Sequence, residues 1–160
     1  DGILADAYGD RCEKANIVND IPQISFPLEW EGAPEGTKSF AIIFMDYDNC
    51  ESEGFPFVHW LAANIPAESR SLPEDCGRTG GDFIQGTNSW STKFGPYADI
   101  PKNLTLRFGG PAPGDARHEY ETTIYALDRV LNLKEGFYFS QLRKAMRGHV
   151  LAEAVMYALY

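Results

Sequence analysis

The segment 38–46 reads KSFAIIFMD, a near-continuous apolar run that is rich in β-branched and aromatic residues. A strand with one solvated face alternates apolar and polar side chains, whereas a strand with two covered faces does not. This run does not alternate between its polar ends, so it predicts a strand over 38–46 that is buried on both faces.

Other strand patterns lie on both sides of this run. Residues 24–30 partly alternate apolar and polar side chains, and residues 57–65 form an apolar strand pattern that stops at Pro66. Residues 118–127 give the best strand pattern in the second half of the chain. Residues 103–108 are consistent with a short strand or an insertion.

The remaining segments predict one long loop, one helix and a final strand. Residues 68–101 are dense in Gly, Ser, Asp and Pro and read mainly as loop, which is usually functional at such a length or carries short elements. Residues 140–147 predict a helix that Ser140 caps and Gly148 ends. The tail 152–160 suits a strand or a helix; we expect a strand preceded by one helical turn. Many short strands, Gly/Pro turns and one clear helix indicate a mainly β sandwich with helical additions.

Length and charge narrow the class of protein. A chain of 160 residues with 44% hydrophobic and 13% aromatic residues suits a single domain over 1–160 with a packed core. Its net charge of −9 argues against a nucleic-acid partner and against an anionic membrane surface, since both attract basic segments. No apolar stretch approaches the roughly 18 residues of a membrane span, so we expect no integral membrane association. A bound phosphate or carboxylate must then be held locally, against the overall charge.

The cysteines and the first residues bear on the compartment. Cys12, Cys50 and Cys76 fit no CxxC spacing, so one disulfide with a free thiol and three free thiols are both open. The chain begins at Asp1 without a signal-peptide pattern. We expect reduced thiols in a cytoplasmic protein, with a periplasmic or secreted location left open.

Two of the three histidines adjoin apolar strands and are the first candidates for chemistry. His59 ends an aromatic run, and His118 follows a Gly/Pro turn and shares a strand face with Tyr120. Asp46 and Asp48 close the strand 38–46 and project to one side if the chain stays extended. Taken singly, such pairs are more often the start of a solvated loop or a packed sheet histidine.

Together these groups suit a small zwitterion that carries a phosphate. Imidazole and glycine N–H groups donate to an anion, and carboxylates accept from an ammonium or fix the histidine tautomers. Aspartates beside histidines would also raise the fraction of imidazolium near neutral pH.

Seven segments in order resemble the phosphatidylethanolamine-binding protein family, including its Raf kinase inhibitor proteins and their bacterial and archaeal relatives. The resemblance runs from Cys12 to the C-terminus, and its last segments are similar to the prokaryotic branch. Each segment is weak alone, but the series is specific. The segments are 28–41, 46–48, 59–66, 85–88, 109–120, 125–128 and 148–152.

The resemblance implies a fold of two antiparallel β-sheets with peripheral helices and a small anion pocket at one end. It also implies that the pocket holds phosphate, acetate, cacodylate or a phosphoethanolamine head group, without a metal or another cofactor. The residues that match the family's pocket motifs are Asp46, Asp48, His59, Gly110, Pro111, His118 and Tyr120. His149 also falls in a family motif, and we interpret it as structural.

Two departures from the family pattern concern the pocket rim. The family usually has Asp-Pro-Asp-Ala-Pro where residues 46–50 here read DYDNC, and the loss of both prolines removes the fixed φ that stiffens this rim. The tract 89–108 is also longer than the family pattern, which suits a lid or a partner surface.

The leading hypothesis is a non-enzymatic binding module for a small phosphorylated or carboxylated ligand. No Gly-x-Ser-x-Gly elbow occurs, and the cysteines lie outside the pocket motifs. A second hypothesis is an interaction protein that modulates a kinase or protease through residues 68–101, its partner unknown. A third is a metal-dependent hydrolase, since two histidines and a carboxylate can bind iron or zinc. The resemblance also suggests a homodimer.

Overall fold

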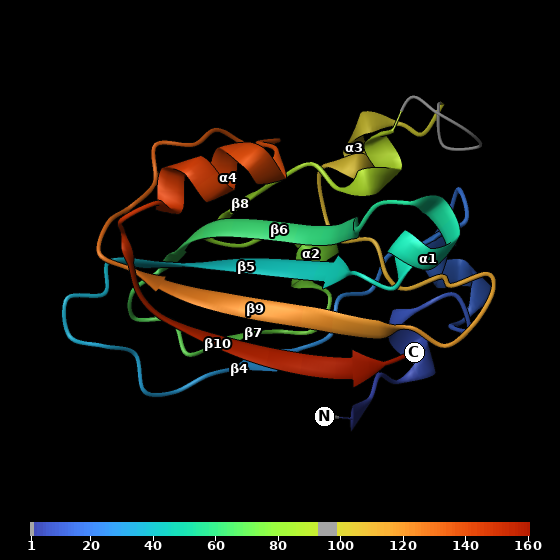
Figure 1. Cartoon of the computed structure of the whole chain (residues 1–160), viewed down its shortest axis with the longest axis horizontal. Helices are drawn as coiled ribbons and strands as arrows, with labels where there is room; N and C mark the ends of the chain where they lie inside the picture. Colours follow the sequence, from blue (N-terminus) through green and yellow to red (C-terminus); the bar gives the residue numbers. More distant parts are fainter. Residues whose placement is uncertain (1, 93–98) are drawn as a thin grey trace.

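A six-stranded sheet forms the centre of the computed structural model, which describes residues 2–92 and 99–160 (Figure 1). Its strand order is β1-β10-β9-β5-β6-β8, and all neighbours are antiparallel except β1 and β10. The strands are β1 (Gly2–Ile3), β5 (Ser39–Asp46), β6 (Phe57–Pro66), β8 (Ile84–Gln85), β9 (Glu119–Leu127) and β10 (Val150–Leu159).

Two small antiparallel sheets and short helices surround the central sheet. The first small sheet pairs β2 (Ile17–Val18) with β3 (Ile21–Pro22), and the second pairs β4 (Leu28–Glu29) with β7 (Ser71–Leu72). The helices are α1 (Asn49–Glu53), α2 (Cys76–Thr79), α3 (Lys102–Thr105) and α4 (Phe139–Met146), with 3₁₀ turns at Asp6–Tyr8, Lys14–Asn16 and Ser89–Ser91. The predicted class, mainly β with antiparallel sheets and peripheral helices, is confirmed.

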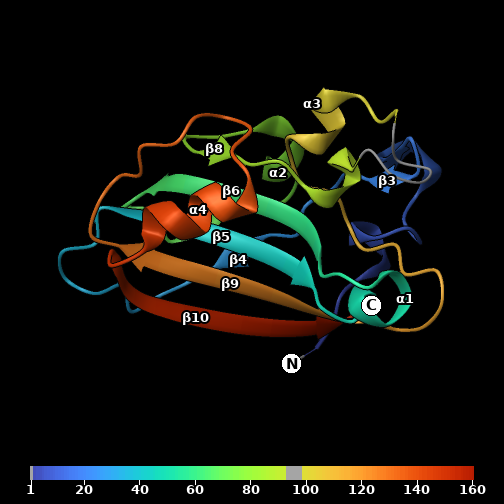
Figure 2. The ribbon, with the colours of Figure 1, turned by 45° about the horizontal axis from the view of Figure 1, so that its top comes forward.

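The central strand β5 is buried along its whole length, as the sequence predicted. On one face, Phe40 and Phe44 join a core cluster that includes Trp60 and to which β4 and β7 contribute. On the other face, Ile43 packs in a second cluster with Leu142 of α4, which covers this side of the sheet (Figure 2). β5 is therefore held rigidly from both sides up to its last residue.

Residues 103–108 were predicted to be a short strand or an insertion. The strand is wrong, because part of this segment is helical. Asn88 explains the difference: its backbone N–H donates to the Thr105 carbonyl at 2.8 Å, and its side-chain amide donates to the Leu104 and Arg107 carbonyls. A residue distant in sequence thus satisfies the carbonyls at the helix end, which a local pattern does not reveal.

Other boundaries were predicted with mixed success. The final strand is confirmed as β10, and Gly148 follows α4 in the left-handed conformation, with a φ of 79°. Ser140 is not the cap, since α4 begins one residue earlier and the Gln141 side chain accepts the Tyr138 N–H at 2.8 Å. Only β4 forms within 24–30, because Pro27 lacks the N–H of a continuous ladder.

The long segment 68–101 carries β7, α2, β8 and a 3₁₀ turn, and its residues 93–98 lie outside the described residues. The lid or partner surface predicted for 89–108 includes those residues and stays a prediction. Cys12, Cys50 and Cys76 are free. Among the described residues, no helix is long and apolar enough to cross a bilayer.

Candidate functional site

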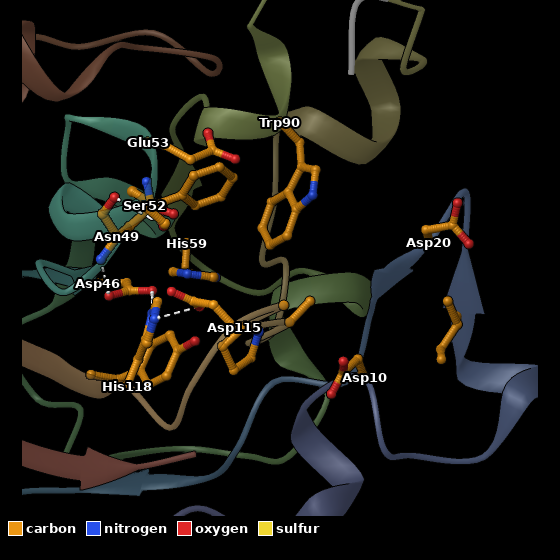
Figure 3. Close-up of a pocket in the computed structure, with 16 residues that line it drawn as sticks. Asp10, Asp20, Asp46, Asn49, Ser52, Glu53, His59, Trp90, Asp115 and His118 are labelled. Carbon is orange, nitrogen blue, oxygen red and sulfur yellow. Dashed lines mark hydrogen bonds and ion pairs between the residues drawn. The ribbon is translucent and has the colours of Figure 1, made fainter. Parts of the chain in front are cut away.

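A cavity of about 610 Å³ lies at the end of the sheet where β5 stops and where β6 and β9 begin (Figure 3). Asp46 ends β5 and pairs with Phe57 of β6 on one side and with Tyr120 of β9 on the other. Antiparallel pairing therefore brings together residues that are far apart in sequence. Helix α1, Trp90 and the turn 112–115 complete the wall, and Asp10 and Asp20 line its outer side.

Four of the seven predicted site residues line this cavity: Asp46, His59, His118 and Tyr120. All four side chains are almost fully buried. The other three, Asp48, Gly110 and Pro111, do not line it. Their contacts show what they do instead.

Asp48 does not share a face with Asp46, because the chain turns into α1 immediately after β5. Its φ and ψ of −67° and −22° are helical, and its carboxylate accepts the Glu119 N–H at 2.8 Å. Asp48 thereby fixes the start of β9 from outside the cavity. The chain is therefore not extended over 46–48, so the two carboxylates do not project to one side.

Gly110 and Pro111 hold the turn against the N-terminal segment. The Gly110 N–H donates to the Pro22 carbonyl at 2.9 Å, and the Pro111 carbonyl accepts the Asp10 N–H at 2.9 Å. A Cβ at position 110 would clash with the Tyr8 carbonyl oxygen. The cavity wall that the resemblance assigned to these two residues is formed by residues 112–114.

Helix α1 occupies the place of the family's proline-rich rim. The Cys50 N–H donates to the Tyr47 carbonyl at 3.1 Å, a bond that a proline at position 50 could not make. The Asn49 N–H donates to Asp46 Oδ1 at 3.0 Å. As a result, Asn49, Ser52 and Glu53 face the cavity.

His118 lies between two carboxylates. Nδ1 is 2.8 Å from Asp46 Oδ2, and Nε2 is 3.0 Å from Asp115 Oδ1. Burial by itself lowers the pKa of His118, but the hydrogen bond and charge of Asp46, followed by those of Asp115, outweigh it and raise the pKa. Backbone hydrogen bonding at Ala116 lowers the pKa of Asp115, which favours its carboxylate form. The raised pKa and the carboxylate at each ring nitrogen therefore favour the imidazolium form of His118, which donates from both nitrogens.

The surroundings of His59 favour the neutral imidazole instead. Its Nδ1 donates to the Gly109 carbonyl at 2.9 Å, which leaves Nε2 as the acceptor nitrogen. The rings of Phe44, Phe57, Trp90 and Tyr120 surround it, with centroids 5.0–5.3 Å away. Burial lowers the pKa of His59 to about 4, although the Gly109 carbonyl and Asp46 favour the charged form. Nearby aspartates thus favour the imidazolium form of both histidines, as expected, but at His59 burial outweighs them.

The pKa values of the two imidazoles should be shifted in opposite directions from the ordinary histidine value. We expect His59 to stay neutral until the pH falls to about 4, and His118 to stay charged above the ordinary histidine pKa of 6.5. Because its folded pKa is lowered, His59 favours the folded state above pH 6.5, and this contribution is lost as the pH falls to about 4. His118 favours the folded state below 6.5, and its contribution is lost as the pH rises through its raised folded pKa. Imidazole ¹⁵N shifts measured from pH 4 to 9 would test this, and a His59 midpoint near 6.5 would contradict it.

Carboxylates dominate the rim of the cavity. Asp10, Asp20, Glu53 and Asp115 line it together with the buried Asp46, and no lysine or arginine among the described residues does so. Sequence reasoning missed all four rim carboxylates. Asp115 had one signal, since it lies three residues before His118 in the Gly/Pro turn. The other three gave none, because they come from separate segments.

Residues 2–92 and 99–160 contain no set of metal ligands that would support the hypothesis of a metal-dependent hydrolase. Within these ranges no three His, Cys, Asp or Glu side chains are placed to hold a metal ion together. The histidine nitrogens nearest the carboxylates are already hydrogen-bonded to them.

Comparisons with known proteins identify the family. A family model described as phosphatidylethanolamine-binding protein matches residues 4–160. The chain belongs to this family. It is similar to YxkA of Bacillus subtilis, with 39% identity over 151 residues that cover 94% of this chain and 89% of that protein. A UPF0098 protein of Methanothermobacter thermautotrophicus is 37% identical over 158 residues, which cover 96% and 94% of the two chains.

Solved structures of the phosphatidylethanolamine-binding protein family have the same fold. Escherichia coli YbcL superposes with a TM-score of 0.74 and 27% identity, over 99% of this chain and 90% of that one. The homologue CT736 of Chlamydia trachomatis gives a TM-score of 0.71 and 28% identity, over 99% and 95%. The family resemblance predicted from the sequence is confirmed.

Proposed function

We propose that this member of the phosphatidylethanolamine-binding protein family is a non-enzymatic binding module for a small zwitterion of the phosphoethanolamine type. The observation that carries the proposal is the meeting of Asp46, His59, His118 and Tyr120 around one cavity. Its volume of about 610 Å³ lies within the range of small-molecule sites, roughly 300–1,000 Å³.

The floor of the cavity suits the oxyanion of such a ligand. The His118 imidazolium is a charged donor, and charge-assisted hydrogen bonds to phosphate are about twice as strong as neutral ones. Burial, and then the charge of Asp46, raise the pKa of Tyr120, so its hydroxyl keeps its proton. Neutral His59 can accept a hydrogen bond from a protonated phosphate oxygen or a water through Nε2.

The rim suits the cationic end of the same ligand. Asp20 and Glu53 offer carboxylate oxygens, and the Trp90 ring lies in the wall beside Phe57, with centroids 4.6 Å apart. An ammonium is attracted by carboxylates and by the face of an aromatic ring. A lone anion would meet the repulsion of this rim, whereas a zwitterion satisfies both parts of the cavity.

An NMR titration followed through the three histidines tests the proposal. O-phosphoethanolamine should shift the imidazole signals of His59 and His118, whereas ethanolamine or phosphate alone should have smaller effects at equal concentration. His149 is a built-in control, because Asp128 and Arg129 hold it at the other end of β9. Unchanged His59 and His118 signals at millimolar O-phosphoethanolamine would refute the proposal.

Tyr120→Phe should weaken O-phosphoethanolamine binding about tenfold, which is the effect of losing one hydrogen bond to a charged group, about 1.5 kcal/mol. The ring and its packing stay in place, so the fold should be unaffected. Tyr125→Phe is the matched control, since Tyr125 lies on the same strand but packs toward α4. Isothermal calorimetry of the three proteins gives the comparison, and equal affinities would exclude Tyr120 as a ligand donor.

The kinase- or protease-modulating role and the homodimer stay predictions from the resemblance. A pulldown from lysate with the wild type and with His59→Ala and His118→Ala variants would separate a partner bound through residues 68–101 from one that depends on the cavity.

A further inference from the structure

The two carboxylates that hold His118 are built very differently. The Asp46 side chain is 5% exposed, ends a strand that is buried on both faces, and also accepts the Asn49 N–H. The Asp115 side chain is 50% exposed and belongs to a turn outside any helix or strand. The hydrogen bond between Asp46 and His118 is therefore fixed by the sheet. The hydrogen bond between Asp115 and His118 can break through a movement of the exposed turn alone.

The Asp115 carboxylate stands where a ligand oxyanion would bind. It presents one oxygen to Nε2 of His118 at 3.0 Å, while Asp46 already occupies Nδ1. A neutral or charged imidazole has only two ring nitrogens. An anion can therefore reach the His118 ring through a hydrogen bond only by replacing one of these carboxylates, and Asp115 is the accessible one.

A second hollow gives the displaced carboxylate somewhere to go. This hollow, of about 300 Å³, shares Asp10, Pro113, Gly114 and Asp115 with the main cavity, so the turn forms the wall between the two. Its lining also includes the cationic side chains of Arg11 and Arg117. Arg11 is already paired with Asp6 at 3.0 Å. Arg117 is exposed and lies only two residues after Asp115, so it is the better candidate to pair with the displaced carboxylate.

We propose that Asp115 is a tethered competitor, an internal carboxylate that occupies the His118 Nε2 position and that an incoming oxyanion displaces toward Arg117. This inference rests on the proposed function, since it concerns how the same cavity admits its ligand. Asp115 thereby lowers the affinity of the cavity for its ligand. When the ligand displaces Asp115, the negative charge of the carboxylate leaves the cavity and the negative charge of the oxyanion takes its place.

The test compares the binding of inorganic phosphate and of O-phosphoethanolamine to the wild type, Asp115→Asn and Asp115→Ala. If Asp115 occupies Nε2 about nine-tenths of the time, its removal raises the apparent affinity about tenfold. Glu119→Gln is the matched control for charge, because it removes one exposed carboxylate beside His118 that does not line the cavity. Measurements at about 0.02 and 0.5 M salt separate direct competition from a general field, since salt screens only the latter strongly.

The outcomes separate this inference from the proposed function. Tighter binding by both Asp115 variants at both salt concentrations, with Glu119→Gln close to the wild type, supports the inference. Equal or weaker binding by the Asp115 variants, with the wild type still shifting its His118 signal, overturns the inference alone. Binding by none of the proteins overturns both.

Arg117→Gln gives a second, independent readout. If Arg117 receives the displaced carboxylate, its loss should weaken phosphate binding in the wild type but have no effect in the Asp115→Ala background. A loss of the same size in both backgrounds would show that Arg117 does not act through Asp115 and would overturn this part of the inference.

Discussion

Asp46→Ala is expected to lower the free energy of unfolding by about 3 kcal/mol, because it breaks a buried charge pair by removing one partner. The Asp46 side chain is 5% exposed, lies 2.8 Å from His118 Nδ1 and accepts the Asn49 N–H at the start of α1. The variant should also lose O-phosphoethanolamine binding, since the His118 imidazolium loses the carboxylate that stabilises its charge.

The control for this change is Asp48→Ala. Asp48 carries the same charge two residues later and is more exposed, and its carboxylate accepts the Glu119 N–H. Its loss should lower stability by about 1 kcal/mol and leave binding largely intact. Urea unfolding followed by circular dichroism measures the free energy of unfolding of both variants. Equal effects of the two substitutions would show that Asp46 is an ordinary loop carboxylate.

Gly110→Ala is the second large effect, with an expected loss of about 2 kcal/mol from overpacking. The new Cβ would meet the Tyr8 carbonyl oxygen, which is backbone and cannot rotate away, and would lie 2.9 Å from the Pro22 Cβ. The turn or the N-terminal segment must therefore shift.

Gly114→Ala, in the same turn, is the matched control. A Cβ at position 114 has no heavy atom within 4 Å, so we expect a change within about 0.5 kcal/mol. Thermal unfolding of both variants measures the difference. If Gly110→Ala were as stable as Gly114→Ala but failed to bind O-phosphoethanolamine, Gly110 would be a ligand contact, as the resemblance implied, and not a residue that holds the turn.

Local sequence patterns predicted the sheet because hydrophobic periodicity directly reflects which faces are covered. The runs at 38–46, 57–65 and 118–127 became β5, β6 and β9 with small shifts at their ends. Helix α3 escaped prediction because Asn88, a residue far away in sequence, satisfies its terminal carbonyls. The 46–50 segment was recognised as a departure from the family, but its conversion into α1 depends on hydrogen bonds to Asp46 and Tyr47.

The candidate site was predicted to the extent that residue types allow. The four residues that meet at the cavity were singled out because the two histidines adjoin apolar strand patterns and because all four match the family's pocket motifs. They meet because β6 and β9 pair with β5. Their protonation was not predictable, since burial among aromatic rings lowers the pKa of His59 while Asp46 and Asp115 raise the pKa of His118. The acidic rim also escaped, because spatial neighbours from separate loops leave no common pattern.

A crystal structure of the protein soaked with O-phosphoethanolamine would show whether the ligand binds among Asp46, His59, His118 and Tyr120. We expect phosphate density in the main cavity, with its oxygens within hydrogen-bonding distance of the Tyr120 hydroxyl and the His118 ring. Ligand density only outside this cavity, or His59 and His118 directed into separate regions, would contradict it.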